Sequence, residues 1–386
     1  MSRLTLLLIA IGAMHGRCDS LAIAQERVDP PIAGVIESRL EVIPALVQRA
    51  IEQGDLPGAV VLIRYRGRNL FFHAFGHRQL EPTSEPMTTD TMFDLASLTK
   101  PVCTATCIHL LIEQGKLTLD DPVARWIPEF AQNGKEAVTV RHLLTHVSGL
   151  TPDNALSDYT NDPSLAFQRI HELPLRTPAG EKFAYSDVGF LVLGELVEQV
   201  SGQTLDRFAA EQLFTPLGMH NTRFRPGAEL RSRIAPTELR DGEMLRGIVH
   251  DPRAHALGGV AGHAGLFSTA ADLAAFGDMI LHNGRAGDRR ILAQESVERV
   301  LTPQPVSAGT RSLGWDMQTS YSTNKGDLLS DQAIGHGGFT GTVLWIDPAQ
   351  ELVFVFLASR LHPDGKGSVN LLAGRIATIA AAALPE

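Results

Sequence analysis

Ser97 and Lys100 stand three residues apart in the stretch DLASLTKPV, and a hydroxyl beside an amine can support nucleophilic catalysis. A serine hydroxyl is a weak nucleophile at neutral pH, so it needs a neighbouring group that takes its proton. Positions i and i+3 of a helix lie about 5 to 6 Å apart on one face, so these two side chains can meet in a helical segment. Spacing alone decides little, because Ser322 and Lys325 repeat it.

The surroundings of the two copies favour Ser97 as the nucleophile. An apolar set at helical spacing follows it: Val102, Ala105, Ile108, Leu111 and Ile112. Pro101 is tolerated near a helix start, and Gly115 suits a left-handed helix end. Ser322 lies instead in a polar run without an apolar period. We therefore expect Ser97 on the first turn of a helix, where unpaired backbone N–H groups and the helix dipole stabilise an alkoxide.

Other catalytic plans find little support in the sequence. No Gly-x-Ser-x-Gly stretch is present, which disfavours the nucleophile elbow of an α/β-hydrolase. His-Glu-x-x-His, Cys-x-x-Cys and His-x-His patterns are also absent, which disfavours a metal centre. We expect neither a metal nor an organic cofactor.

Two further stretches could complete a serine site. Tyr185, in FAYSDVGF, is expected to begin an amphipathic helix, where a cationic lysine could hold the phenol as a phenolate that accepts the serine proton. The stretch GHGGFTGTVLW places glycines before a strand, so a substrate backbone could approach closely and pair with the strand edge. An isolated tyrosine is more often an anchored interface side chain. The prediction of a serine site therefore depends on Tyr185 and the glycine-rich stretch occurring together with Ser97 and Lys100.

Strand patterns stand near both ends of the chain, with mostly helical patterns between them. Residues 59–65 and 70–76 read as a hairpin after a helix over 36–53, and LGWDM, GTVLWIDP and ELVFVFLAS read as strands before a final Ala-rich helix. This order predicts an α/β (α+β) fold with a mostly antiparallel sheet built from both termini and flanked by helices. Residues 25–90 and 310–386 would form the sheet domain, and residues 91–309 an inserted, mainly helical domain that carries the nucleophile. A cleft between the two is the natural place for a site.

The composition and the N-terminal segment indicate which partners the protein can bind and where in the cell it works. The chain has 386 residues, is 44% hydrophobic and carries a net charge of −9, which predicts a globular protein that does not bind nucleic acid. Residues 1–24 read as an export signal, because Arg3 precedes an apolar run over 4–14 and Ala22 and Ala24 form a small-x-small cleavage pattern. That run is too short for a stable membrane span. We expect an exported protein, periplasmic or secreted.

The three cysteines give no sign of a disulfide or a redox centre. Arg17 directly before Cys18 fits a lipid-attachment signal poorly. Cys103 and Cys107 fall four residues apart on the expected helix, where a disulfide would be strained, so we expect two small buried side chains.

Taken together and in order, several stretches resemble the penicillin-recognising serine hydrolases, the group that holds D-Ala-D-Ala carboxypeptidases, class C β-lactamases and related esterases. The resemblance covers nearly all of the chain after the signal, through FDLASLTKPV, LLTHVSGL, YSDVGFLVLGELVEQVSG, LFTPLGMHNT, GLFSTAADLAAF and GHGGFTG. It implies Ser97 as the acylated nucleophile, Lys100 as its partner, and Tyr185 as general base and acid.

The same resemblance implies a substrate-binding strand and an oxyanion site. His336 stands where the family has lysine or histidine, followed by Gly337 and Gly338. The backbone N–H groups of Ser97 and Phe339 would form the oxyanion hole.

Two positions qualify the resemblance. Asp187 replaces the family's asparagine, and an aspartate would favour a charged Lys100 and repel a substrate carboxylate unless it is itself paired or protonated. The Tyr-Ser-Asp stretch and the loop GVAGHAGLFST resemble sequences assigned as D-Ala-D-Ala carboxypeptidases of bacterial envelopes. His263 in that loop is a candidate for the pocket border, with a purely structural role as the alternative. His146 is expected to be structural and to bond backbone.

The function that these features favour is an exported D-Ala-D-Ala carboxypeptidase that cleaves peptidoglycan stem peptides through an acyl-enzyme. A secreted esterase or a β-lactamase of the same family is the alternative, and no residue type separates them. A non-catalytic penicillin- or muropeptide-binding module is a further alternative. A pure binder needs no proton relay, so the set of Ser97, Lys100, Tyr185 and His336 argues against the module. The expected partners are small peptides or esters, including peptidoglycan.

Overall fold

The computed structural model describes residues 24–25, 32–160 and 162–385. Apart from Ala24, the predicted signal segment lies outside the described residues. Among the described residues, no helix combines the length and apolar character that a bilayer crossing requires.

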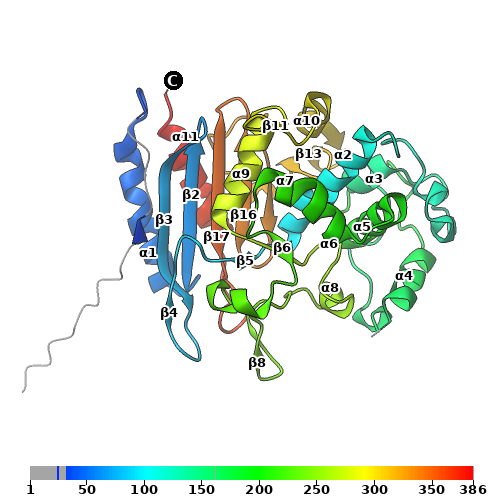
Figure 1. The fold of residues 1–386 in the computed structure, drawn as a ribbon, viewed down its shortest axis with the longest axis horizontal. Coiled ribbons are helices and arrows are strands. Elements are labelled where there is room, and N and C mark those ends of the chain that lie inside the picture. Colours follow the sequence, from blue (N-terminus) through cyan, green and yellow to red (C-terminus); the bar gives the residue numbers. More distant parts are fainter. Residues whose placement is uncertain (1–23, 26–31, 161, 386) are drawn as a thin grey trace, which may run out of the picture.

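A ten-stranded antiparallel sheet forms one half of the molecule (Figure 1). Its order is β1-β3-β2-β17-β16-β15-β14-β13-β12, with β4 paired to β3, so strands from both ends of the chain meet in its centre. The strands are β1 (Ala24–Gln25), β2 (Gly58–Tyr65), β3 (Arg68–Gln79), β4 (Glu85–Pro86), β12 (Gln304–Val306), β13 (Gly309–Arg311), β14 (Asp316–Gln318), β15 (Ile334–Gly338), β16 (Thr342–Asp347) and β17 (Leu352–Ala358). The predicted fold class is confirmed.

Helices cover both faces of this sheet. Successive strand residues point to opposite faces, so in β2 Val61 and Ile63 join one apolar cluster, while Val60 and Leu62 join the other. The first cluster lies under α1 (Ile43–Glu52) and α11 (Asn370–Ala382), and the second under α9 (Ala270–Leu281). Burial on both faces explains why the central strands read as continuous apolar runs. The expected helix over 36–53 begins as a 3-10 helix (Glu37–Val42) before α1.

The middle of the chain is mostly helical, as expected, with small sheets between the helices (Figure 1). Its helices are α2 (Thr106–Glu113), α3 (Val140–Leu144), α4 (Pro163–Glu172), α5 (Asp187–Ser201), α6 (Leu205–Ala209), α7 (Thr215–Leu217), α8 (Pro252–Ala256) and α10 (Gln294–Leu301). Its short strands are β5 (Phe93–Asp94), β6 (Arg223–Phe224), β7 (Leu239–Arg240), β8 (Glu243–Met244), β9 (Leu266–Ser268), β10 (Arg285–Ala286) and β11 (Arg289–Arg290). The larger apolar cluster joins α9, α5 and α2 to the sheet, and the division into two domains stays a prediction.

The nucleophile segment departs from the regular helix that the sequence predicts. Ser97 lies in a short 3-10 turn (Ala96–Leu98), a π-helical turn (Lys100–Ala105) follows, and only then does α2 begin. Pro101 has no N–H to donate, so a regular hydrogen-bond ladder cannot form through it. Ala96 adopts a φ of 45°, which a residue with a side chain rarely does. Irregular turns of both kinds are frequent at functional sites.

Both described cysteines match expectation. Cys103 and Cys107 are buried and form no disulfide. Burial raises the pKa of the Cys103 thiol well above its ordinary value, so it behaves as an apolar side chain.

Candidate active site

Ser97 and Lys100 are in direct contact, whereas Ser322 and Lys325 point to other partners. Lys100 Nζ donates a hydrogen bond to Ser97 Oγ at 2.9 Å. Lys325 Nζ instead donates to the Met317 carbonyl at 3.1 Å. Ser97 lines a cavity of about 250 Å³, just below the range that is typical of drug-sized ligand pockets.

Lys100 is a buried ammonium with a carboxylate beside it. Its side chain has no exposed area, and Nζ lies 2.6 Å from Asp187 Oδ1 and 3.3 Å from the His263 carbonyl oxygen. Burial lowers the pKa of Lys100, but the Asp187 carboxylate raises it, with a net rise above the ordinary value. Lys100 is therefore charged and cannot itself take the serine proton.

Tyr185 lies beside both groups but is not a phenolate at rest. Its ring centroid is 4.9 Å from Lys100 Nζ, and its ring stacks on His146 at 4.5 Å and on Tyr321 at 5.0 Å. Burial raises the pKa of the Tyr185 phenol, the Lys100 charge lowers it, and the Asp187 charge raises it, with a net rise. The expectation of a resting phenolate is wrong because burial and the replacement of asparagine by Asp187 outweigh the lysine.

The start of α5 fixes Tyr185 through its neighbour Ser186. Ser186 caps the helix, because its Oγ accepts from Gly189 N–H at 3.0 Å and donates to the Thr151 carbonyl at 2.7 Å. Its own N–H donates to His146 Nδ1 at 3.0 Å. Tyr185 thus precedes the helix instead of beginning it, and His146 bonds backbone, as expected. Burial lowers the pKa of His146 well below its ordinary value.

His336 lines the same cavity. It lies in the middle of β15, its Nδ1 donates to the Gly337 carbonyl at 2.7 Å, and its ring centroid is 5.8 Å from that of Tyr185. Burial lowers the pKa of His336 well below its ordinary value, and the charges of Arg311 and Lys100 lower it further. A neutral imidazole therefore faces the cavity.

Gly337, Gly338 and Phe339 line the same cavity, but the two glycines are needed first for packing inside the protein. A Cβ on Gly338 would lie 2.3 Å from the Leu95 carbonyl oxygen, and one on Gly337 would lie 2.6 Å from Asn324 Nδ2. Gly338 lets β15 approach the segment just before Ser97, and Gly337 leaves room for Asn324. Internal packing therefore explains why both positions are glycine. The reason expected from the sequence was different, the close approach of a substrate backbone.

His263 does not border the cavity. Its ring is buried, and Nε2 lies 2.9 Å from Asp251 Oδ1. Burial would raise the pKa of Asp251, but the His263 imidazole holds it well below the ordinary value. The backbone carbonyl of His263 faces Lys100. The contact between His263 and Asp251 holds the loop behind the lysine, which favours the structural alternative.

Sequence reasoning missed five residues that also line this cavity: Arg311, Asp316, Tyr321, Asn324 and Asn370. The one available signal was a charged pair flanking the apolar stretch SLGW, since charged residues are rarely fully buried without a role.

One cluster could in principle hold a metal ion. Oxygen or nitrogen atoms of Asp187, Asp251 and His263 lie within 4.8 Å of one another. The ammonium of Lys100, 2.6 Å from Asp187, already places a positive charge there, and His263 already pairs with Asp251. These pairs account for the cluster without an ion.

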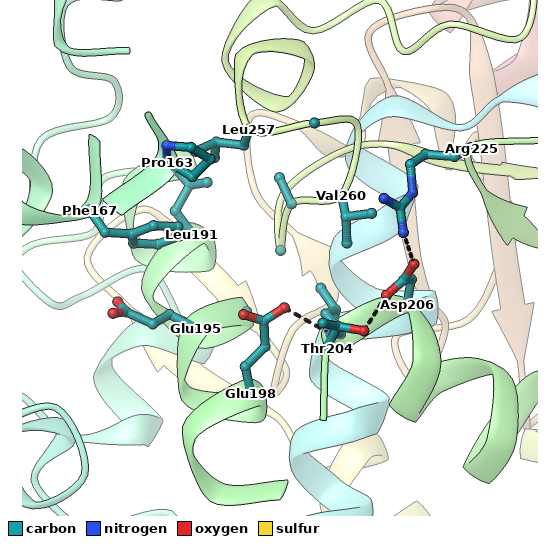
Figure 2. A pocket seen from close by; sticks show the side chains of 15 residues that line it. Pro163, Phe167, Leu191, Glu195, Glu198, Thr204, Asp206, Arg225, Leu257 and Val260 are labelled. Carbon is teal, nitrogen blue, oxygen red and sulfur yellow. Dashed lines mark hydrogen bonds and ion pairs between the residues drawn. The ribbon is translucent and has the colours of Figure 1, made fainter. Parts of the chain in front are cut away.

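A second cavity of about 220 Å³ lies between α5, α6 and the loop 257–262 (Figure 2). Its charged groups are occupied within the protein: Glu198 accepts from Leu205 N–H at 2.9 Å, and Asp206 pairs with Arg225. The only hydroxyl that lines it, on Thr204, donates to Asp206 at 2.6 Å. Among the described residues that line this cavity none is an activated nucleophile, so the chemistry is assigned to the cavity at Ser97.

Comparison with known proteins assigns the chain to a family. The family model described as Beta-lactamase matches residues 43–378. A protein of Escherichia coli (strain K12) with the name "Putative D-alanyl-D-alanine carboxypeptidase" is 34% identical over 370 residues, covering 86% of this chain and 85% of that protein. An N-acetylmuramyl-L-alanine amidase of Bacillus subtilis (strain 168) is 32% identical over 361 residues, covering 84% and 81%. The chain therefore belongs to the Beta-lactamase family and is a serine hydrolase of that family.

Solved structures agree on the fold. A penicillin-binding protein homologue from Caulobacter crescentus superposes with a TM-score of 0.73 at 22% identity, covering 92% of this chain and 100% of that one. A class C β-lactamase gives a TM-score of 0.75 at 20% identity, covering 92% and 99%.

Proposed function

We propose that the protein is a D-Ala-D-Ala carboxypeptidase-like peptidase that acts through an acyl-enzyme on Ser97. The observation that carries the proposal is the contact of Lys100 Nζ with Ser97 Oγ at 2.9 Å, with Tyr185 beside it at the wall of one cavity. The carboxypeptidase name of the Escherichia coli relative supports the substrate class.

In the proposed acylation, Ser97 Oγ attacks the scissile carbonyl and Tyr185, as phenolate, takes its proton. Lys100 stays an ammonium and stabilises that phenolate. The carbonyl oxygen becomes an oxyanion between the N–H groups of Ser97 and Phe339. When the amide C–N bond breaks, the Tyr185 phenol gives its proton to the leaving amine. Water then attacks the ester, Tyr185 takes the water proton and returns it to Ser97 Oγ, and the acid product leaves.

A second candidate substrate is the amide between N-acetylmuramic acid and L-Ala, since the Bacillus subtilis relative is named for cleaving it. The chemistry at Ser97 would be the same, because both reactions cleave an amide. The two candidates differ in the acyl group and in the leaving amine that the cavity must accept.

A hydrolysis panel separates the candidates. It contains a D-Ala-D-Ala peptide, an N-acetylmuramyl-L-Ala peptide, a chromogenic cephalosporin and short acyl esters, each with wild type and Ser97→Ala. The proposal predicts the fastest turnover on the D-Ala-D-Ala peptide, and none of it in Ser97→Ala. Turnover confined to esters or to the cephalosporin would move the function to the esterase or β-lactamase alternative, and binding without turnover to the binding module.

We also propose that the protein is exported to the periplasm or secreted. The support is the pattern of residues 1–24: a positive residue, an apolar run and two small residues. Fractionation of cells that express the full chain should place a shortened protein outside the cytoplasm, whereas full-length protein in the cytoplasm would contradict export.

A further inference from the structure

Asp94 is a buried acid that the proposed mechanism does not use. It ends β5, three positions before Ser97, and only 2% of it is exposed. Both of its carboxylate oxygens accept backbone N–H groups, Oδ1 from Ala96 at 2.9 Å and Oδ2 from His250 at 2.7 Å. Burial raises the pKa of Asp94 above its ordinary value, although both hydrogen bonds lower it. A carboxylate is costly to bury, so its place beside the nucleophile calls for a reason.

The first of these hydrogen bonds holds a strained residue directly before the nucleophile. Ala96 has a φ of 45°, in the left-handed region that alanine rarely adopts. A carboxylate that accepts from the N–H two residues on closes a local turn and fixes the backbone there. The Ser97 N–H lies in the plane of the peptide that joins it to Ala96, so the conformation of Ala96 sets where that N–H points. The Asp94 carboxylate therefore fixes the direction of one proposed oxyanion donor.

The second hydrogen bond reaches the other side of the proposed oxyanion hole. The imidazole of His250 stacks on the ring of Phe339, with the ring centroids 5.7 Å apart and the planes 29° apart. The Asp94 carbonyl also accepts from Oγ1 of Thr340, the residue after Phe339, at 2.6 Å. Asp94 therefore contacts the neighbours of both proposed donors, the N–H groups of Ser97 and Phe339. Donors that are fixed before charge develops stabilise an oxyanion without reorganisation.

We propose that Asp94 is a positioning residue, which fixes the N–H groups of Ser97 and Phe339 and so sets the rate of attack by Ser97. This rests on the proposed acylation of Ser97, but not on the identity of the acyl group. Without the carboxylate, Ala96 relaxes toward negative φ and turns the Ser97 N–H away. The barrier to attack then rises, while the groups that bind substrate are unchanged. kcat should therefore fall and KM should stay the same.

The test is a double-mutant cycle of Asp94→Ala and Ala96→Gly, read as the rate constant for fluorophosphonate labelling of Ser97. The phosphoryl oxygen of this probe takes the place of the oxyanion. Asp94→Ala should lower the rate constant roughly 10- to 100-fold, since a misplaced oxyanion donor costs about this much. Glycine adopts a positive φ as readily as a negative one, so it needs no carboxylate to hold it there. In the Ala96→Gly background, the same substitution should therefore cost at least about fivefold less.

Asp347→Ala is the matched control. Asp347 is also buried and also accepts backbone N–H groups, from Ser330 at 2.6 Å and Ala349 at 3.1 Å, but it does not line the cavity. It should lose stability and keep the wild-type rate constant. The labelled fraction at completion reports how much of each variant is folded, which separates a folding defect from a slower reaction.

Asp94→Asn takes the place of Asp94→Ala in the cycle if the alanine variant yields no labelled protein. Its side chain offers one acceptor to two N–H groups, so it should also lower the rate constant, and by less in the Ala96→Gly background.

An equal cost in both backgrounds overturns the inference, as does an unchanged rate constant with a smaller labelled fraction. A rise in KM with kcat unchanged, on any substrate that wild type hydrolyses, also overturns it. If wild type is labelled at Ser97 but hydrolyses neither candidate amide, the peptidase proposal fails on its own, and the cycle still decides the role of Asp94. A wild-type label on another serine overturns both.

Discussion

Burial and the Asp187 carboxylate both act on the protonation of Lys100 and Tyr185. Lys100 would lose its proton more readily if only burial acted on it, and the Asp187 carboxylate at 2.6 Å reverses this. The same carboxylate raises the pKa of Tyr185. Asp187 therefore favours the charged lysine, and together with burial it favours the neutral phenol at rest. The form of the enzyme that can accept the Ser97 proton becomes more abundant as pH rises.

Asp187→Asn should move the rising limb of the kcat/KM profile to lower pH. Removing the carboxylate removes one cause that raises the pKa of Tyr185, so the phenolate forms at lower pH. Labelling of Ser97 should persist. The measurement is kcat/KM from pH 6 to 10, with Glu351→Gln, an exposed acid paired with Arg66, as the control. A limb that stays in place or moves to higher pH would show that Asp187 does not set this charge state.

At the residue scale, the sequence predicts which site residues meet when they are close along the chain or when they belong to a known family motif. Ser97 and Lys100 meet because they are three positions apart, and Tyr185 was placed by its motif. Arg311 was missed because its position depends on how β13 pairs with β14, which local spacing does not encode. His263 was placed too close to substrate because its partner, Asp251, lies twelve residues away in the same loop region.

At the level of elements, the close approach of β15 to the segment before Ser97 positions the site. Thr340 and Thr342 donate hydrogen bonds from their Oγ1 atoms to the Asp94 and Leu95 carbonyls at 2.6 and 3.0 Å. Gly338 leaves the room that this contact needs. The sequence predicted the strand, but not the π-helical turn after Ser97, because apolar periodicity cannot distinguish it from a regular helix.

Gly338→Ala should lower the free energy of unfolding by about 1 to 3 kcal/mol and slow Ser97 labelling, because the added Cβ meets a backbone carbonyl that cannot move aside cheaply. Gly189→Ala is the matched control. It lies in α5, and its nearest neighbours would be 3.6 Å from the new Cβ, so it should be neutral or stabilising by up to about 1 kcal/mol. Both quantities come from urea unfolding and labelling rates. Equal stability and equal labelling in the two variants would show that β15 can shift freely.

On the scale of the whole molecule, the sheet joins both ends of the chain around a core that excludes water. The sequence revealed this architecture because a central strand from each end of the chain is mostly apolar, β2 near the N-terminus and β17 near the C-terminus. The same core encloses histidines. Burial lowers the pKa of His109 from 6.5 to about 4, aided by the charge of Arg299.

This burial predicts that stability falls in mild acid. A histidine whose pKa is lowered by folding stabilises the protein above its unfolded pKa, and the contribution is lost as pH falls from about 6.5 toward about 4. His109 alone should account for a loss on the order of 2 kcal/mol between pH 7.5 and pH 5. Urea unfolding at the two values measures it, and His109→Gln should show a smaller difference than wild type. A difference of the same size in both proteins would exclude His109 as its cause.

The central claim, that Ser97 is the acylated nucleophile, is tested most directly by locating a fluorophosphonate label by peptide mass spectrometry. The label is expected on Ser97 and should be lost in Ser97→Ala. Tyr185→Phe should be labelled at least about 100-fold more slowly, because positioned proton transfer contributes that much to the rate. Ser322→Ala should be labelled at the wild-type rate. A label on another serine, or one that persists in Ser97→Ala, would contradict it.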